Sequence, residues 1–217
     1  MARSRDEVGA GLERTLSFSA VGEAIVEEFL EGPEVSASIF VLDGQVAVCQ
    51  MSDRLALEGY PGGIPRAHRL PSQAATPQDA AAVTALLDQL VAALRIRQGP
   101  AYAQLKLTSG GPRLIEMSPR LDGCYLWRLV RAATGIDLLA ATATLLGGGS
   151  PDLQAVGPLH PMSLLMLHRP PGAVFREVDV PMPAAAVAWG FHYREGEVVR
   201  PVNGFMETVG YCLVAGA

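Results

Sequence analysis

Residues 101–123 read AYAQLKLTSGGPRLIEMSPRLDG, and this stretch carries the fold assignment. Two mainly apolar runs, residues 102–108 and 113–117, flank the cluster Ser-Gly-Gly-Pro at 109–112. The glycines of this cluster can adopt the positive φ that a tight reversal needs. The stretch therefore predicts a β-hairpin. In it, Gln104 and Glu116 lie opposite or nearly opposite one another, within the one-residue uncertainty of the loop.

Such a hairpin brings oxygen-bearing side chains together. Gln104 and Glu116 would face the same space, and Ser118 and Arg120 follow just past the second strand. Hard cations prefer oxygen ligands, and a guanidinium matches the geometry of a phosphate, so a site for Mg²⁺ and a phosphate is one interpretation. The other is an ordinary amphipathic hairpin with a polar outer face, which so short a motif does not exclude.

Composition limits the classes of function. The chain has 217 residues, of which 49% are hydrophobic, so it can bury a substantial core as one large domain or two small ones. Its net charge of -5, without any block of Lys or Arg, argues against nucleic acid or an anionic membrane as the main partner. No apolar run reaches the roughly 18 residues of a membrane helix, and the first residues contain no apolar signal core. We therefore expect a cytoplasmic protein that has no membrane partner.

Two residue types add constraints. The three cysteines, Cys49, Cys124 and Cys212, are scattered and lack metal-ligand spacing, which favours reduced thiols. Of the 17 basic residues, 16 are arginine and only Lys106 is lysine. A mechanism that requires two lysines cannot be complete in this chain.

The periodicity of the chain predicts helices and strands in an irregular order, which favours an α+β fold over a doubly wound sheet. The turn residues Asp43-Gly44 predict a hairpin, and residues 58–73, rich in Pro and Gly, predict a loop that contains His68. Helices are expected at residues 5–18, 77–94, 124–134 and 136–146, and strands outside the first hairpin at 24–30, 35–42, 45–51, 159–167, 174–180, 185–193, 198–202 and 208–214.

Four stretches, taken in order, resemble the ATP-grasp superfamily of carboxylate–amine ligases. They are AIVEEFLEGPEVS at 24–36, LDGQVAVCQMSD at 42–53, PRAHRLPSQ at 65–73 and QGPAYAQLKLTSGGPRLIEMSPRLDGCYLWRLVRAATGIDL at 98–138. The resemblance implies part of an ATP-grasp fold, with an antiparallel central sheet flanked by helices. It implies three parts: residues 1–35, a remnant of the nucleotide-lid subdomain with the adenine hinge; 36–149, the C-terminal subdomain with the metal-binding hairpin; and 150–217, a small β-rich region.

The resemblance also implies a reaction class and its cofactors. ATP phosphorylates a carboxylate, and an amine attacks the acyl phosphate and releases phosphate, with Mg²⁺, or alternatively Mn²⁺, on the triphosphate. The adenine hinge maps onto Glu27, Glu28, Phe29 and Leu30, whose backbone would read the edge of the base. Glu34 maps near the ribose hydroxyls.

The remaining site residues follow from the same resemblance. Glu116 maps onto the metal-bridging glutamate, and Gln104 onto the second metal position, where many relatives have glutamate. Ser118 stands where asparagine is the usual third ligand. Arg120 is expected to hold the substrate carboxylate or the acyl phosphate. His68 would approach the phosphate or the substrate, or would be only a polar residue of the loop.

Ahead of the hinge, relatives carry a carboxylate-binding domain, a lysine-bearing strand pair and a glycine-rich phosphate loop, which this sequence lacks. The expected function is therefore that of the adenine hinge and Mg-ATP hairpin of an ATP-dependent, ADP-forming carboxylate–amine ligase, inactive alone. Its expected partners are small carboxylate and amine substrates, and the missing N-terminal half or a second copy of the chain. Two alternatives remain: a purine-pathway or carbamoyl-phosphate-type synthetase, and a degenerate non-catalytic module for binding or interaction.

Overall fold

The computed structural model describes residues 2, 4–60, 63–202 and 204–216, and it divides into two units, Met1–Glu31 and Gly32–Ala217. In the first unit, helix α1 spans Arg5–Ser17 as predicted. Its N-cap Ser4 accepts a hydrogen bond from the backbone N–H of Glu7, and no residue of the helix is buried. The described part of this unit therefore has a well-capped helix and no buried core.

The strand predicted at residues 24–30 is wrong. These residues have no regular secondary structure, and the side chains of Ile25 and Phe29 are 83% and 61% exposed. An isolated strand leaves its backbone N–H and C=O groups without partners, and the described part of the first unit holds no second strand to supply them. The apolar run therefore forms neither a strand nor a buried segment.

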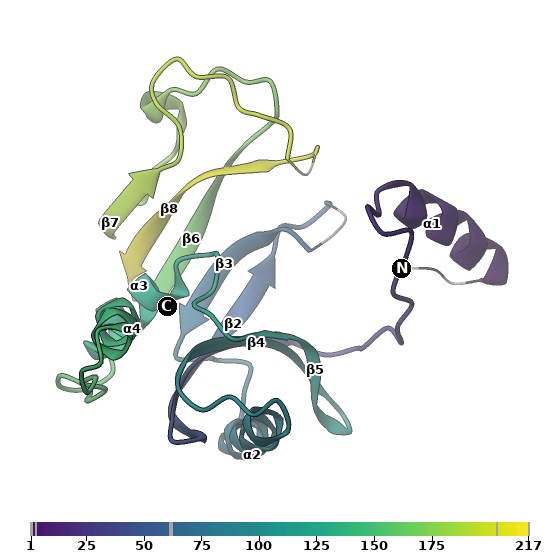
Figure 1. Cartoon of the computed structure of the whole chain (residues 1–217). Helices are drawn as coiled ribbons and strands as arrows, with labels where there is room; N and C mark the ends of the chain where they lie inside the picture. The colour runs from purple at the N-terminus through teal and green to yellow at the C-terminus, as the bar shows by residue number, and fades with distance from the viewer. Residues whose placement is uncertain (1, 3, 61–62, 203, 217) are drawn as a thin grey trace. The chain divides into compact units, whose positions relative to one another are not determined.

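The second unit is built on one antiparallel sheet of eight strands in the order β5-β4-β1-β2-β3-β6-β8-β7 (Figure 1). The α+β prediction and its antiparallel central sheet are confirmed. The strands are β1 Glu34–Leu42, β2 Gln45–Ala56, β3 Pro65–Leu70, β4 Gly99–Thr108, β5 Gly111–Ser118, β6 Met162–Arg169, β7 Ala186–Phe191 and β8 Glu207–Ala215.

Local turn chemistry fixes the first hairpin. Asp43 and Gly44 connect β1 to β2 with φ values of 51° and 79°, the left-handed pair that a two-residue hairpin turn requires. At the other end of β1, Gly32 has φ 134°, and a Cβ there would collide with the carbonyl oxygen of Leu107 on β4. Glycine at this position therefore lets the chain enter β1 close against β4.

Helix α2, Pro77–Ala93, covers one face of the sheet. It begins where predicted, and Thr76 and Asp79 hydrogen-bond each other's backbone there in a capping box. Its buried side chains Val83, Leu87 and Val91 pack against alternate residues of β1 and β4. The residues between them on β1, including Phe40, belong to the opposite face, so β1 is buried on both sides.

Helices α3, Leu126–Thr134, and α4, Leu138–Leu146, pack on that opposite face (Figure 1). Gly135 ends α3 at φ 78°, as predicted. Helix α4 begins two residues later than predicted, because Asp137 caps it by accepting hydrogen bonds from the N–H groups of Leu139 and Ala140. Among the described residues no single helix has the length and hydropathy to cross a membrane; α3 and α4 pass that test only as a pair bent by 109°.

The predicted loop at 58–73 contains strand β3, so His68 lies on a strand and the loop prediction is wrong there; residues 61 and 62 fall outside the described residues. β3 is possible despite its prolines because Pro65 is its first residue and Pro71 follows its last. It pairs with β2 on one side and β6 on the other.

In the C-terminal region, three of five predicted strands are present as β6, β7 and β8, and they extend the same sheet across the predicted boundary at 149. The predictions at 174–180 and 198–202 are wrong. Those segments form one isolated bridge, between Val174 and Val198, with a few backbone hydrogen bonds beside it, and the first contains the 3₁₀ turn Glu177–Asp179.

Candidate functional site

The sheet gathers polar side chains on the face opposite α2. Strand register places Gln104 of β4 directly opposite Glu116 of β5, which confirms the predicted juxtaposition. On its other side Gln104 pairs with Ser36 of β1, and Ser36 pairs with Ser52 of β2. Because paired residues share a face, these four side chains form one row across four strands.

Two further pairings widen this surface. Ser118 lies opposite Tyr102, so it lies on the same face as Glu116 at the end of β5. Glu34 pairs with Lys106 on one side of the row. We call this set of residues on the face opposite α2 the polar platform: Glu34, Ser36, Ser52, Arg54, His68, Tyr102, Gln104, Lys106, Glu116 and Ser118.

A chain of hydrogen bonds crosses the platform. The Tyr102 hydroxyl lies 3.1 Å from Ser36 Oγ and donates to Gln104 Oε1 at 3.4 Å. Ser52 Oγ donates to the Ser36 carbonyl at 3.4 Å and lies 3.4 Å from Nδ1 of His68. Buried hydroxyls cost free energy unless they are bonded, so this chain keeps the inner part of the platform both polar and stable.

Glu34 is the most heavily contacted carboxylate of the platform. Its Oε1 accepts from Arg54 Nη1 at 2.7 Å and from the side-chain amide of Gln104. Its Oε2 lies 3.4 Å from Lys106 Nζ. Arg54 also donates to the Gly63 carbonyl at 2.8 Å. The positive charge of the platform is therefore held in place by neighbouring acceptors.

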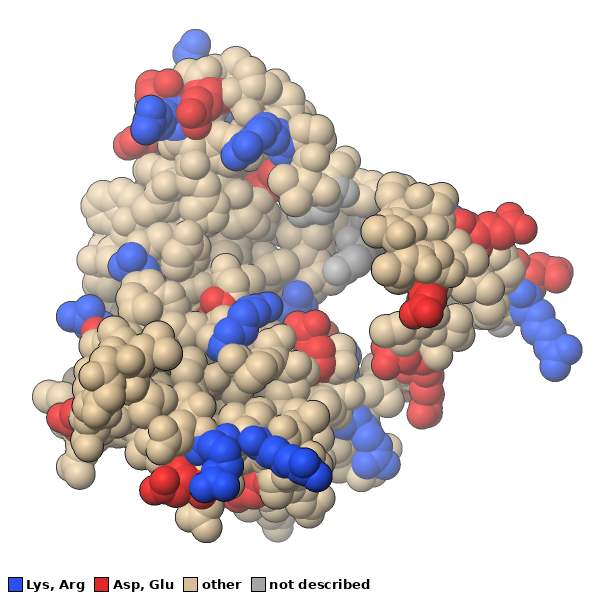
Figure 2. Space-filling view, viewed as in Figure 1, with Lys and Arg blue, Asp and Glu red and all other residues tan. Residues whose placement is uncertain are grey.

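Figure 2 shows acidic and basic side chains interspersed over the face in view, with many uncharged residues between them. Any affinity of this region for phosphate thus depends on individual cations, which are Arg54 and Lys106 of the platform and Arg120 just past the hairpin. Arg54 was not singled out in the sequence, because its strand neighbours His68, Glu34 and Tyr102 lie 14 to 48 residues away in the chain and only the folded structure reveals them.

His68 is buried, with 1% of its surface exposed, which contradicts the idea of a polar surface residue on a loop. Burial, and then the nearby charge of Arg54, lower its pKa from 6.5 to about 3. The imidazole is therefore neutral at pH 7. Among the described residues none bonds its Nε2 atom. A neutral ring with one unbonded nitrogen can donate or accept a hydrogen bond but cannot serve as a cation for phosphate.

The segment 119–125 follows the hairpin and leads into α3. Its Arg120 is exposed, and Nη1 donates to the neighbouring Leu121 carbonyl at 2.9 Å. Asp122 accepts from the backbone N–H groups of Cys124 and Leu126, and so caps the start of α3. Burial raises the pKa of Asp122 to about 6, and the hydrogen bonds and Arg120 oppose this shift.

This segment lies beside the platform, because Leu121 and Cys124 pack against the apolar cluster that contains Tyr102. Burial raises the pKa of the Cys124 thiol, Asp122 raises it further, and Arg54 and Arg120 lower it. Tyr102 is influenced by Arg54, Cys124 and Asp122 after the dominant effect of burial, which raises its pKa. The loop after the hairpin and the centre of the platform thus belong to one electrostatic environment.

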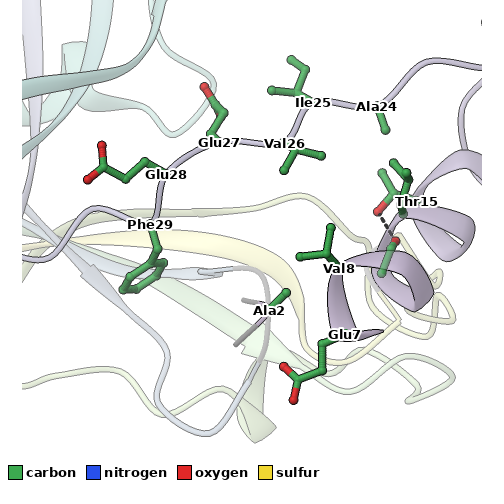
Figure 3. A pocket seen from close by; sticks show the side chains of 12 residues that line it. Ala2, Glu7, Val8, Thr15, Ala24, Ile25, Val26, Glu27, Glu28 and Phe29 are labelled. Atoms are coloured by element: carbon green, nitrogen blue, oxygen red, sulfur yellow. Dashed lines mark hydrogen bonds between the residues drawn. The ribbon is translucent and has the colours of Figure 1, made fainter. Parts of the chain in front are cut away.

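The predicted hinge residues lie in the other unit. Glu27, Glu28 and Phe29 are exposed, and Leu30 is half-buried. Together with α1, the segment 24–29 encloses a cavity of about 390 Å³, across which Val8 and Val26 point toward one another (Figure 3). The four predicted hinge residues therefore lie in the first unit. The other six predicted site residues lie in the second unit: Glu34, His68, Gln104, Glu116, Ser118 and Arg120.

The hairpin offers a small donor set for a cation. Gln104 supplies an amide oxygen, Glu116 an exposed carboxylate and Ser118 a hydroxyl. Within the described residues there is no group of three or more His, Cys, Asp or Glu side chains able to enclose a metal by themselves. Mg²⁺ is commonly held by one or two carboxylates, with water and substrate phosphates completing its shell. The residues present fit a Mg²⁺ ion bound jointly with a nucleotide.

Residues 10–126 match the family model of the ATP-grasp domain. This chain belongs to the ATP-grasp family. It is 32% identical over 137 residues to carnosine synthase 1 of Mus musculus, a match that covers 63% of this chain and 16% of the relative.

Solved structures share the fold. An L-amino acid ligase from Bacillus licheniformis has a TM-score of 0.77 at 20% identity, over 99% of this chain and 55% of that one. The biotin carboxylase domain of a 2-oxoglutarate carboxylase from Hydrogenobacter thermophilus, in complex with MgADP, has a TM-score of 0.75 at 14% identity, over 99% and 49%. The chain thus spans about half the length of these structures and a smaller share of the curated relative.

Proposed function

We propose that this chain supplies the adenine hinge and the Mg-ATP hairpin of an ATP-dependent, ADP-forming carboxylate–amine ligase. The observation that carries the proposal is the pairing of Gln104 with Glu116 within the residues that match the ATP-grasp model. A cation held there would offset negative charge on the phosphoryl group in transfer, which is the main catalytic requirement of such a step.

Each residue of the hairpin has a distinct role in this proposal. Glu116 is exposed and supplies the one carboxylate of the donor set. Gln104 contributes an oxygen without charge, and Ser118 contacts the ion through water or not at all. Arg120 has an exposed guanidinium just past the hairpin, suited to a forked contact with the substrate carboxylate or acyl phosphate.

His68 acts as a neutral group in this scheme. Its low pKa excludes an imidazolium at pH 7, so it would orient a phosphate or a substrate through the hydrogen-bonding capacity of Nε2. The hinge residues Glu27, Glu28, Phe29 and Leu30 would read adenine through backbone groups.

For the substrates, we propose an amino acid or a similar small carboxylate, joined to a small amine. The likeness to carnosine synthase 1 supports this class. The fold alone does not select it, because an amino acid ligase and a biotin carboxylase domain match almost equally well. We also propose that the complete enzyme works in the cytoplasm.

The partner in this proposal is the remainder of an ATP-grasp fold, or a second copy of the chain. Ile25, Val26 and Phe29 are largely exposed, which provides apolar surface for such a partner. We expect the 217-residue chain alone to bind Mg-ATP weakly and to turn over no substrate. A stable monomer at high concentration in sedimentation, or robust ligation by this chain alone, would contradict these expectations.

A non-catalytic binding module is the second candidate, because Gln104 and Ser118 make the donor set poor in charge. A titration of the chain with Mg-ATP by calorimetry tests the site on which both depend. Glu116→Ala should weaken Mg-ATP binding at least 10-fold, since it removes the only carboxylate among the three hairpin donors. The matched control is Glu13→Ala, an exposed carboxylate on α1.

The outcomes separate the proposals. Loss of Mg-ATP binding in Glu116→Ala, with unchanged binding in Glu13→Ala, supports the metal site. Equal Mg-ATP affinity of wild type, Glu116→Ala and Glu13→Ala rules out the metal site. If the metal site stands, adding the remainder of a related fold should yield ATP-dependent amide formation. Tight Mg-ATP binding without turnover in that assembly would favour the binding module.

A further inference from the structure

The carboxylate of Glu34 is already occupied by protein groups. Oε1 accepts from Arg54 and from Gln104, and Oε2 faces Lys106, whose Nζ also donates to the Gly32 carbonyl at 3.1 Å. The Glu34 side chain is only 17% exposed. Oε1 already accepts two hydrogen bonds, so a ribose hydroxyl, the ligand implied by the family resemblance, would have to approach Oε2 beside Lys106. The contacts indicate a different use for Glu34.

This contact determines which way the amide of Gln104 points. An ionised carboxylate can only accept hydrogen bonds, so the amide group that faces Glu34 must be the nitrogen. The amide oxygen is then on the other side, where the Tyr102 hydroxyl donates to it at 3.4 Å. Gln104 lies directly opposite Glu116, and its amide oxygen, which accepts this one long bond, has a second lone pair that a cation at the hairpin could use.

The same contact explains why residue 104 is a glutamine. A glutamate there would place a second carboxylate within hydrogen-bonding distance of Glu34, and two ionised carboxylates at that separation repel strongly. The amide removes the repulsion and keeps an oxygen donor. What looked in the sequence like the loss of a ligand is, in the structure, complementary to Glu34.

We propose that Glu34 is a positioning residue that holds the Gln104 amide with its oxygen toward the metal site. This role rests on the proposed function, since it presupposes that Gln104 is a ligand. Glu34 also fixes Arg54 and Lys106 beside the same amide, so one carboxylate orders three donors around the hairpin. It acts on the cation through Gln104.

A double-mutant cycle tests this route. Mn²⁺ binding to the 217-residue chain saturated with ADP is followed by electron paramagnetic resonance of free Mn²⁺ for wild type, Glu34→Ala, Gln104→Ala and the double variant. Loss of a group that orients a metal ligand typically weakens metal binding 10-fold or more, so Glu34→Ala should weaken it about 10-fold. In the Gln104→Ala background the same change should have an effect under about 2-fold, because the group through which Glu34 acts is gone.

Direct charge and ribose binding give different results. If Glu34 acts on the cation by its own charge, its removal weakens Mn²⁺ binding equally in both backgrounds, and the proposal is overturned. If Glu34 binds ribose, Glu34→Ala weakens ADP binding measured by calorimetry in the presence of EDTA, which also overturns it. Unchanged metal-free ADP binding together with a non-additive Mn²⁺ cycle supports it.

Two further results keep the test decisive. If Glu34→Ala does not fold, Glu34→Gln replaces it; its amide no longer forces one orientation on Gln104, and a smaller loss of the same kind is expected. If wild type and Gln104→Ala bind Mn²⁺ equally, the positioning role fails while the result for Glu116 stands. If wild type binds no Mn²⁺ in the presence of ADP, the proposed metal site is wrong, and the positioning role that rests on it is wrong with it.

Discussion

The two faces of strands β1 and β4 differ in what their side chains contact. On one face, Val35, Ala37 and Ile39 pack against the buried side chains of α2. On the other, Ser36 and Tyr102 are buried and bonded to each other. Burial of apolar surface stabilises a fold directly, whereas buried hydroxyls roughly break even once they are bonded. Apolar burial stabilises the sheet on both faces, through α2 on the first and through Phe40 and the helices α3 and α4 on the second, whereas the row of polar side chains on the second face is better explained by binding chemistry.

The largest expected effect concerns His68 on the polar face. Its pKa is 6.5 unfolded and about 3 folded, so between these values the unfolded state binds more protons. Stability from this group is fully present above pH 6.5 and is lost as the pH falls toward 3. The loss amounts to at most roughly 5 kcal/mol. Denaturant unfolding of the chain at a series of pH values between 3 and 7 measures it.

His68→Gln is the matched variant, because glutamine stays polar and does not titrate in this range. Asp122 must be considered in the same experiment, since its raised pKa of about 6 makes the folded state bind more protons between 3.8 and 6. That contribution lowers stability as the pH rises, opposite in sign to that of His68. If the free energy of unfolding changes with pH in the same way for wild type and His68→Gln, the conclusion that His68 is buried and neutral is wrong.

How far the sequence predicted these faces depends on the range of the interactions. The hairpin of Gln104 and Glu116, and the start of α2 at Pro77, were predicted because turn glycines and a proline in the first turn of a helix act locally. The strand containing His68 was missed because prolines and glycines surround it, and its place between β2 and β6 is set by long-range pairing. The role of Arg54 depends on the same register.

The apolar run at 24–30 shows the converse error. The β-branched and aromatic residues favour a strand locally, but strand formation also needs a partner strand, which no local pattern reports. The substitution of glutamine at 104 is similar. Read alone it indicates a weakened metal site, and only the contact with Glu34, 70 residues away, gives it a structural reason.

The second prediction concerns the apolar face. Leu87 of α2 is fully buried, so Leu87→Ala should destabilise the chain by about 3 kcal/mol through lost burial and a residual cavity. Leu94, at the end of the same helix and 58% exposed, is the control, and Leu94→Ala should cost less than about 1 kcal/mol. Both are measured by denaturant unfolding. A small effect at Leu87 would mean that α2 does not anchor this face.

The smallest expected effect returns to the polar face. Tyr102→Phe removes one hydroxyl and leaves Ser36 Oγ without its 3.1 Å partner, while the ring remains packed. Hydrogen bonds of this kind contribute about 1 kcal/mol net, so the loss should be well below that for Leu87→Ala. The control is Tyr60→Phe, since Tyr60 is 39% exposed.

Because the Tyr102 hydroxyl also donates to Gln104 Oε1, the same variant separates stability from binding. That bond is long, at 3.4 Å, and Glu34 alone is enough to force the nitrogen of the amide toward itself. Mn²⁺ affinity in the presence of ADP should therefore change by less than about 2-fold in Tyr102→Phe, against about 10-fold in Glu34→Ala. If Tyr102→Phe proved the more damaging of the two, the orientation of Gln104 would be set by the tyrosine hydroxyl, and the polar face would depend on its hydroxyl chain more than on its carboxylate.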